Sequence, residues 1–139
     1  MNALIVRDSA GSGGGTRHKV LLTRRAVEPH KGMWDTPGGF VDIGELTEEA
    51  VIRECAEELG VEVRIRGLVS ISADTYGGEH TLVLSYWCEL GSGEPHPADD
   101  VDAVAWFPVS SPAPLAFRNG QEAIRALRGL LDDPQTAPR

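Results

Sequence analysis

Three glutamates, Glu54, Glu57 and Glu58, lie close together in the first half of the chain. The stretch around them, 47–59, contains neither Gly nor Pro and is followed by Gly60, a pattern that predicts a helix with Thr47 as its N-cap. At about 100° per residue the three carboxylates share one arc of this helix, beside an apolar arc. The apolar arc consists of Val51, Ile52, Cys55, Ala56 and Leu59. The three carboxylates, here called the glutamate rim, are therefore expected where the helix meets the rest of the protein.

The glutamate rim is electrostatically unfavourable by itself. Glu54 is three and four residues from Glu57 and Glu58, and like charges at those spacings repel by roughly 0.2–0.5 kcal/mol. Near the C-terminal end of a helix the dipole disfavours each anion by a further 0.3–1 kcal/mol, roughly. One guanidinium, that of Arg53, cannot neutralise the whole rim, whereas Mg²⁺ or Mn²⁺ takes carboxylate oxygens as preferred ligands. The helix alone indicates either a divalent-metal site or a solvated acidic face.

The residues before the helix favour the metal site. Gly39 is followed after five residues by Glu45, and after seven more by the run Arg-Glu-Cys-Ala-Glu-Glu-Leu-Gly-Val at 53–61. This pattern resembles the signature of the Nudix hydrolase family, GX5EX7REUXEEXGU, where U is a bulky aliphatic residue. The chain departs from it at Cys55, which takes the first U position. Cysteine buries well as a small hydrophobic residue, so the departure affects packing and not chemistry.

The resemblance implies a role for each matching residue. Mg²⁺ or Mn²⁺ would be bound by the glutamate rim together with the carbonyl of Gly39. Arg53 would orient the glutamates, and Glu45 would support the metal site or pair with Arg53. The implied reaction is hydrolysis of a nucleoside diphosphate linked to another group, X, and the implied fold is an α/β/α sandwich with a mixed sheet and two main helices. The flanks look most like the ADP-ribose and NADH-type branches of the family, and nucleoside triphosphates are also possible substrates.

Two aspects of the chemistry stay open at this stage. The general base is one of the helical residues Glu54 and Glu57, which we favour, or an acid of a later loop, Asp99 or Asp100. A non-catalytic nucleotide-sensing module with the same fold is the alternative function, although such a module is expected to have lost a glutamate of the signature. Isomerisation of a prenyl diphosphate is a third reading, and it would need further acid and thiol residues.

Two adjacent arginines, Arg24 and Arg25, follow the second expected strand. They are either solvated cations at a strand end or ligands of substrate phosphates, which the planar guanidinium suits. The resemblance favours phosphate binding, because family members often carry a basic residue here. Trp34, shortly before the signature, is expected to pack in the interior and not to stack on a base.

The composition excludes several classes of function. A net charge of −8 argues against nucleic-acid and membrane-surface binding, since phosphate groups are held by Lys and Arg. No stretch reaches 18 apolar residues and no signal peptide is recognisable, so we expect a cytoplasmic protein. Cys55 and Cys88 are expected as free core thiols. The expected partner is a small nucleotide, and a homodimer is possible because dimers are common in the family.

Periodicity and turn residues predict the remaining elements. Strands are expected at 2–6, 19–24, 80–90 and 101–107, and one or two more within 61–73, with a turn at 74–79. The glycine-rich segment between the first two strands is expected to be a flexible hairpin connection. A second helix is expected at 119–131, with Asn119 and Glu122 forming a capping box. One domain is expected over 1–133, followed by a flexible tail at 134–139.

Overall fold

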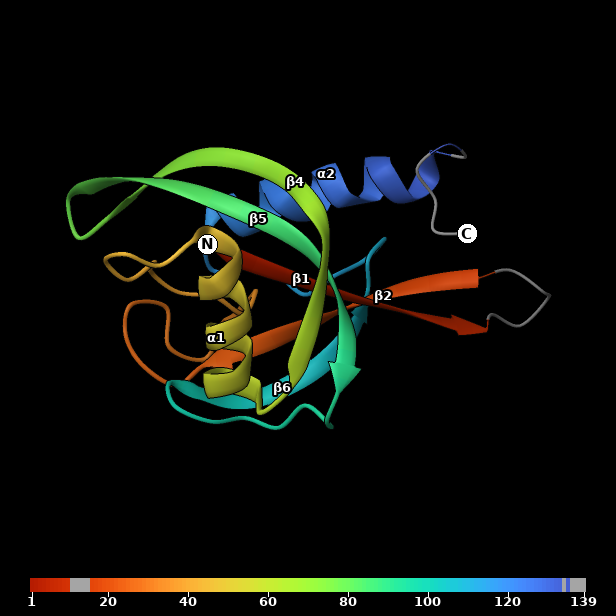
Figure 1. Ribbon diagram of the computed structural model, residues 1–139, viewed down its shortest axis with the longest axis horizontal. Coiled ribbons are helices and arrows are strands. Elements are labelled where there is room, and N and C mark those ends of the chain that lie inside the picture. The colour runs from red at the N-terminus through yellow and green to blue at the C-terminus, as the bar shows by residue number, and fades with distance from the viewer. Residues whose placement is uncertain (11–15, 134, 136–139) are drawn as a thin grey trace.

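The computed structural model describes residues 1–10, 16–133 and 135, and it contains one mixed sheet and two helices (Figure 1). The strands and helices, in chain order, are β1 (Asn2–Ala10), β2 (Thr16–Arg25), β3 (Trp34–Asp35), α1 (Thr47–Leu59), β4 (Glu62–Tyr76), β5 (Glu79–Ser92), β6 (Val101–Pro108) and α2 (Arg118–Asp132). The hairpin connection and the tail that the sequence predicts lie largely outside the described residues.

The sheet has the strand order β3-β2-β1-β5-β4, with β6 also paired to β2. Strands β1 and β5 are parallel, and the other pairs are antiparallel. The start of β1 therefore lies in the middle of the sheet. This places the N-terminal residues beside the segment that leads into α1, through a bridge between Asn2 and Gly38.

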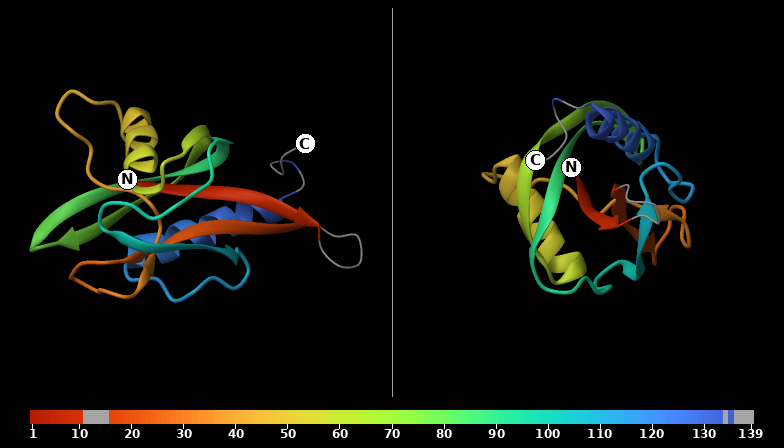
Figure 2. Two further views of the ribbon diagram at one scale, coloured as in Figure 1. Left: turned by 90° about the horizontal axis from the view of Figure 1, so that it is seen from below. Right: turned by 90° about the vertical axis from the view of Figure 1, so that its right-hand side faces the viewer.

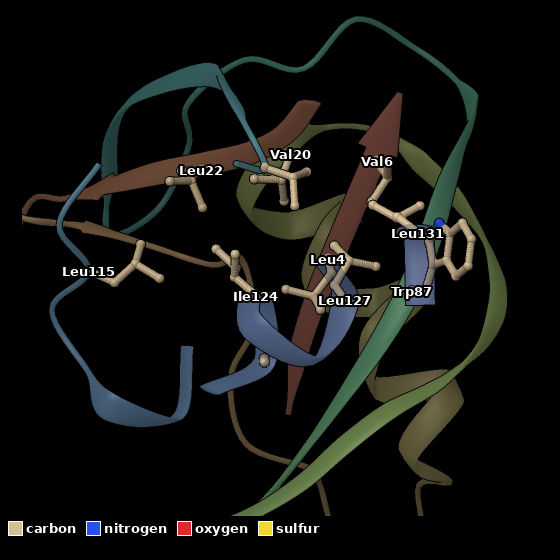
Figure 3. Close-up of a cluster of buried hydrophobic side chains, with 11 residues drawn as sticks. Leu4, Val6, Val20, Leu22, Trp87, Leu115, Ile124, Leu127 and Leu131 are labelled. Atoms are coloured by element: carbon tan, nitrogen blue, oxygen red, sulfur yellow. The ribbon is translucent and has the colours of Figure 1, made fainter. Parts of the chain in front are cut away.

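The two helices pack on opposite faces of the sheet (Figure 2). Alternation along β1 shows the two faces directly, because Leu4 and Val6 contact α2 while Ala3 and Ile5 belong to the core under α1. Figure 3 shows the α2 side, where Ile124, Leu127 and Leu131 meet the sheet. The expected α/β/α arrangement is confirmed.

The strands are longer than the sequence indicates. Residues 62–76 form a single strand, β4, with register shifts at its irregular positions, and the turn to β5 is reduced to Gly77 and Gly78. Strand β3 was not expected at all, because a two-residue strand has no readable period. Pairing with strands that are distant in the sequence determines both the length of β4 and the presence of β3.

Both predicted helix N-caps are wrong. Helix α1 begins at Thr47 itself, and the Thr47 hydroxyl lies 2.7 Å from the hydroxyl of Tyr86, while Glu49 accepts a hydrogen bond from the Leu46 N–H. Helix α2 begins at Arg118, so Asn119 falls inside its first turn. In each case a tertiary hydrogen bond engages the side chain that local sequence suggested as a cap.

The buried stripe of α1 is narrower than predicted. Ala50, Val51, Cys55 and Leu59 are buried, whereas Ile52 is 44% exposed. Cys55 and Cys88 are both buried free thiols, as expected. Among the described residues, no helix is long and apolar enough to cross a membrane.

Candidate metal and nucleotide site

The backbone before α1 forms a close-packed cradle at the start of β1. The Ala3 N–H donates to the Pro37 carbonyl at 2.8 Å, and the Gly39 N–H donates to the Met1 carbonyl at 3.2 Å. A side chain at Gly38 would collide with the Met1 carbonyl oxygen, and a Cβ at Gly39 would lie 2.5 Å from Glu54 Oε1. Gly38 is therefore required for the chain to approach β1, and a side chain at Gly39 would displace the Glu54 carboxylate.

Arg53 is the centre of a network of carboxylates. Its Nε donates to Glu45 Oε2 at 2.7 Å and its second terminal nitrogen donates to Glu45 Oε1 at 2.9 Å, which makes a bidentate pair. The other terminal nitrogen donates to Glu54 Oε1 at 2.9 Å and to Glu57 Oε2 at 3.2 Å. Hydrogen bonding to Arg53 lowers the pKa of Glu45 to about 2. Of the two roles left open for Glu45, the structure shows the pairing with Arg53.

Glu58 has a different environment from the other rim glutamates. It points toward the cradle, where its Oε2 accepts a hydrogen bond from the Gly38 N–H at 3.2 Å. The pKa of Glu58 is raised to about 8, mainly by burial and also by the charges of Glu54, Asp35 and Asp99, against the lowering effect of the Gly38 N–H. Burial also raises the pKa of Glu54, against Arg53. Both carboxylates are costly to ionise, so a cation placed between them would be strongly favoured.

The donor set fits a hard divalent cation. It offers carboxylate oxygens from the glutamate rim and the carbonyl oxygen of Gly39, and it contains no thiolate or imidazole. The carbonyl of Gly39 already accepts a hydrogen bond from a cationic group, the Met1 ammonium, at 2.7 Å. Among the described residues the acidic side chains do not converge into a preformed metal cluster. Arg53 and Gly38 hold them instead, so binding requires some of these contacts to be exchanged.

The loop before β6 attaches to the C-terminal end of α1. The N–H groups of His96 and Ala98 donate to the carbonyls of Leu59 and Glu58, at 3.1 and 3.0 Å. This contact places Asp99, at a φ of 51°, close enough for its charge to raise the pKa of Glu58. Asp100 is held by its backbone, since its carbonyl accepts from the Ala26 N–H at 2.9 Å. Of the two loop acids, Asp99 is the one whose charge acts on the rim.

The structure separates the two arginines that the sequence grouped together. Arg24 donates to Asp102 on β6 at 2.6 Å, an ion pair that engages its Nε. Arg25 has different neighbours, with a terminal nitrogen 3.7 Å from Asp35 and its guanidinium 5.0 Å from the Phe117 ring centroid. Only Arg25 lies beside the rings described next.

A cluster of aromatic rings, which the sequence did not reveal, lies beside the cradle. Ring centroids are 6.2 Å apart for Phe40 and Tyr76, 5.1 Å for Tyr76 and Phe117, and 5.3 Å for Phe117 and His30. Phe40 directly follows the cradle and is 68% exposed. These four residues, here called the ring cluster, come from four separate segments, so no local pattern could have identified them. Trp34 instead packs on Phe107 in the α2-side core, as expected.

Polar groups form the floor beneath the ring cluster. Asn119 is 2% exposed and donates to Asp74 at 2.7 Å and to the Tyr76 hydroxyl, while its carbonyl accepts from Asn2 at 2.8 Å. This network fixes the Tyr76 ring and the start of β1 together. Nearby, burial raises the pKa of Asp35 to about 6, and the buried hydroxyl of Thr36 has no hydrogen-bond partner among the described residues.

Comparison with known proteins identifies the family. The model of the NUDIX domain matches residues 3–127. The chain is 34% identical over 102 residues to the ADP-ribose pyrophosphatase of Methanocaldococcus jannaschii and 36% identical over 101 residues to the NAD-capped RNA hydrolase NudC of Pseudomonas aeruginosa. A crystal structure of a MutT NUDIX hydrolase from Burkholderia pseudomallei superimposes with a TM-score of 0.77 at 32% identity, covering 91% of this chain and 94% of that one. The chain belongs to the Nudix family.

The curated relatives are longer than the segment they share with this chain. The matches cover 72% of this chain in both cases, but 60% of the archaeal pyrophosphatase and 36% of the NudC protein.

Proposed function

We propose that this protein is a divalent-metal-dependent hydrolase that cleaves the diphosphate linkage of a nucleoside diphosphate joined to another group. The observation that carries the proposal is the glutamate rim itself: three carboxylates beside the Gly39 carbonyl, two of them with pKa values raised by burial. Such a site is stabilised when it binds positive charge, and a diphosphate needs positive charge before a nucleophile can approach it. The relatives that act on ADP-ribose and on NAD-capped RNA support the same reaction class.

Each residue of the site has a proposed role. Glu54, Glu57, Glu58 and the Gly39 carbonyl would hold Mg²⁺ or Mn²⁺, which when bound neutralises phosphate oxygens and lowers the pKa of a coordinated water. Arg53 fixes Glu54 through a 2.9 Å hydrogen bond and is itself fixed by Glu45. Glu57 is the most exposed of the rim side chains that Arg53 holds, at 48%, so its carboxylate is free to turn toward a substrate and accept the proton.

The ring cluster would hold the planar part of the substrate. Bases stack on aromatic side chains with roughly 1–3 kcal/mol each, and a guanidinium adds a cation–π contact. Arg25 lies beside Phe117 of the ring cluster, and Phe40 of the same cluster follows the cradle directly, so a nucleoside held there would have its phosphates at the rim. We therefore propose Arg25, and not Arg24, as the arginine that contacts substrate.

The setting of the protein follows from the same features. We propose that residues 1–133 act as one domain and that the protein works in the cytoplasm. Two buried free thiols, Cys55 and Cys88, support a reducing compartment.

The test is hydrolysis of a substrate panel with Mg²⁺ and Mn²⁺. ADP-ribose, NADH, dinucleoside polyphosphates and nucleoside triphosphates are incubated with the protein, and released phosphomonoesters are measured through a coupled phosphatase. We expect turnover of at least one member only when a divalent metal is present. Glu57→Gln should abolish most of it, while Glu48→Gln, which removes an exposed acid from the first turn of the same helix, should not.

The same experiment distinguishes a hydrolase from a nucleotide-sensing module. A sensor would bind a nucleotide without releasing phosphomonoester, and its binding would not depend on the glutamate rim being charged. Binding of ADP-ribose by calorimetry with no turnover of any panel member would overturn the hydrolase proposal.

A further inference from the structure

Two cavities among the described residues lie away from the glutamate rim. One, of about 510 Å³, is formed where the start of β2, the end of β6 and the C-terminal part of α2 meet. A second, of about 390 Å³, lies between α2 and the segment 112–115. Arg128 lines both cavities, so the two are adjacent along α2 and are together called the groove. Figure 1 shows α1 on the left and the C-terminal end of α2 on the right.

The charge of the groove is opposite to that of the chain. Four basic residues line it, Arg17, Lys19, Arg125 and Arg128, against one acid, Asp132. The whole chain has 13 basic and 21 acidic residues. A local excess of cations on an acidic protein focuses negative ligands into that place. We call this surface the basic groove.

Three of the four basic side chains of the groove form no ion pair with a described residue. In the part of the chain that the structure describes, no carboxylate lies within ion-pair distance of Lys19, Arg125 or Arg128. Several other arginines form ion pairs: Arg24 pairs with Asp102, Arg64 with Glu89 and Arg118 with Glu122. The basic groove therefore contains three cations, Lys19, Arg125 and Arg128, that form no ion pair with a described carboxylate.

The walls supply hydrogen-bond donors and an apolar floor. Ser110 and Ser111 present exposed hydroxyls at the end of β6, next to Lys19 across the β2–β6 pair. Val109 and Leu131 form the buried floor. Hydroxyls and guanidinium groups around a concave surface are the donors that phosphate oxygens accept from, and the volume is in the range of small-ligand sites.

We propose that the basic groove is a second, non-catalytic binding site for a phosphate-bearing anion. Arg128 is its central ligand, with Lys19 and Arg125 contributing on either side. The anion comes either from a free phosphomonoester or from the backbone of a polynucleotide, and the chemistry of recognition is the same. The proposal is independent of hydrolysis, because it concerns binding at residues remote from the glutamate rim.

Calorimetric titration with EDTA present tests this site, because without divalent metal the glutamate rim repels phosphate. The probes are inorganic phosphate, AMP, and a short oligoribonucleotide without terminal phosphates. The variants are Arg128→Ala and the double variant Lys19→Ala with Arg128→Ala. Arg64→Ala is the matched control, since it removes the same charge from an exposed site on β4. Thermal unfolding of every variant is recorded with and without the probes.

We expect at least one probe to bind the wild-type protein and the Arg64→Ala variant equally, and to bind Arg128→Ala about tenfold or more weakly, as loss of a charged hydrogen bond requires. Binding of phosphate and AMP alone identifies a phosphomonoester site, and binding of the oligoribonucleotide alone identifies a polynucleotide track. If no probe binds the wild type, or Arg128→Ala binds as the wild type does, the proposal is overturned. A lower melting temperature of Arg128→Ala with unchanged probe binding overturns it too, since the cations would then only stabilise α2.

Discussion

The glutamate rim and the basic groove differ in the sign of their excess charge: the rim is negative and the groove is positive. Around Arg53, four carboxylates lie within 3.5 Å of the guanidinium, two of them from the rim, while the third rim glutamate, Glu58, accepts from the Gly38 N–H instead. In the groove, Lys19, Arg125 and Arg128 have no carboxylate partner among the described residues. The first surface needs a cation and the second needs an anion. In both regions the protein leaves charge that its own side chains do not neutralise. We expect a ligand of opposite charge to neutralise it in each case.

The largest expected effect is on the rim. Glu58→Gln removes the most buried of the three carboxylates, so kcat should fall by about 100-fold or more, as loss of several kcal/mol of transition-state stabilisation requires. Arg128→Ala, in the basic groove, should leave kcat within about twofold, since it touches nothing at the rim. Steady-state kinetics on the best panel substrate measures both. Equal losses in the two variants would mean that the regions are not separate.

A second prediction concerns Asp35, under the ring cluster. Its pKa is raised to about 6 from 3.8, so the folded state binds more protons than the unfolded state between these values. The contribution of Asp35 to stability therefore falls as pH rises from about 4 to about 6, by up to about 3 kcal/mol, and is constant above. Asp35→Asn should remove this slope, which urea unfolding at several pH values measures. Identical slopes in wild type and variant would show that Asp35 is not desolvated.

Arg53 should be sensitive to a change that keeps its charge. Lysine cannot make the bidentate pair with Glu45 and still reach Glu54, so Arg53→Lys should lower activity and metal affinity by about 10–100-fold. Arg64→Lys, on the exposed face of β4, is the control and should be neutral. Activity of Arg53→Lys at the wild-type level would show that charge alone is sufficient at this position.

The smallest predicted effect is at the ring cluster. Phe117→Ala removes the ring between Tyr76 and His30, so KM for a nucleotide should rise about tenfold, the lower part of the stacking range, with little change in kcat. A diphosphate without an aromatic ring, such as phosphoribosyl pyrophosphate, is the comparison substrate. The variant should treat that compound as the wild type does. A similar rise of KM for both compounds would place the base elsewhere.

The comparison also explains what could be foreseen from the sequence. The rim, the cradle and Arg53 lie within one stretch, 38–61, where helical periodicity and fixed spacing bring the side chains together, so the expected residues are neighbours in the structure. The family assignment and the α/β/α fold followed from the same stretch. The sequence was sufficient to predict this site because all of its residues lie close together in the chain.

The features that the sequence did not predict are formed by residues that are far apart in the chain. The ring cluster draws on residues from position 30 to 117, and the basic groove on three segments that meet only after β2, β6 and α2 have packed. Asn119 was assigned to a helix cap because its local context fits one, but burial beside Asn2, Asp74 and Tyr76 gave it other partners. Tertiary contact decided these roles.

Direct measurement of metal binding tests the central claim, that the glutamate rim is a site for a hard divalent cation. Free Mn²⁺ is followed by electron paramagnetic resonance during titration of the wild type, the double variant Glu57→Gln with Glu58→Gln, and the control Glu48→Gln. We expect the wild type and the control to bind Mn²⁺ alike and the double variant to bind at least about tenfold more weakly. Equal Mn²⁺ affinity in all three proteins would contradict the account.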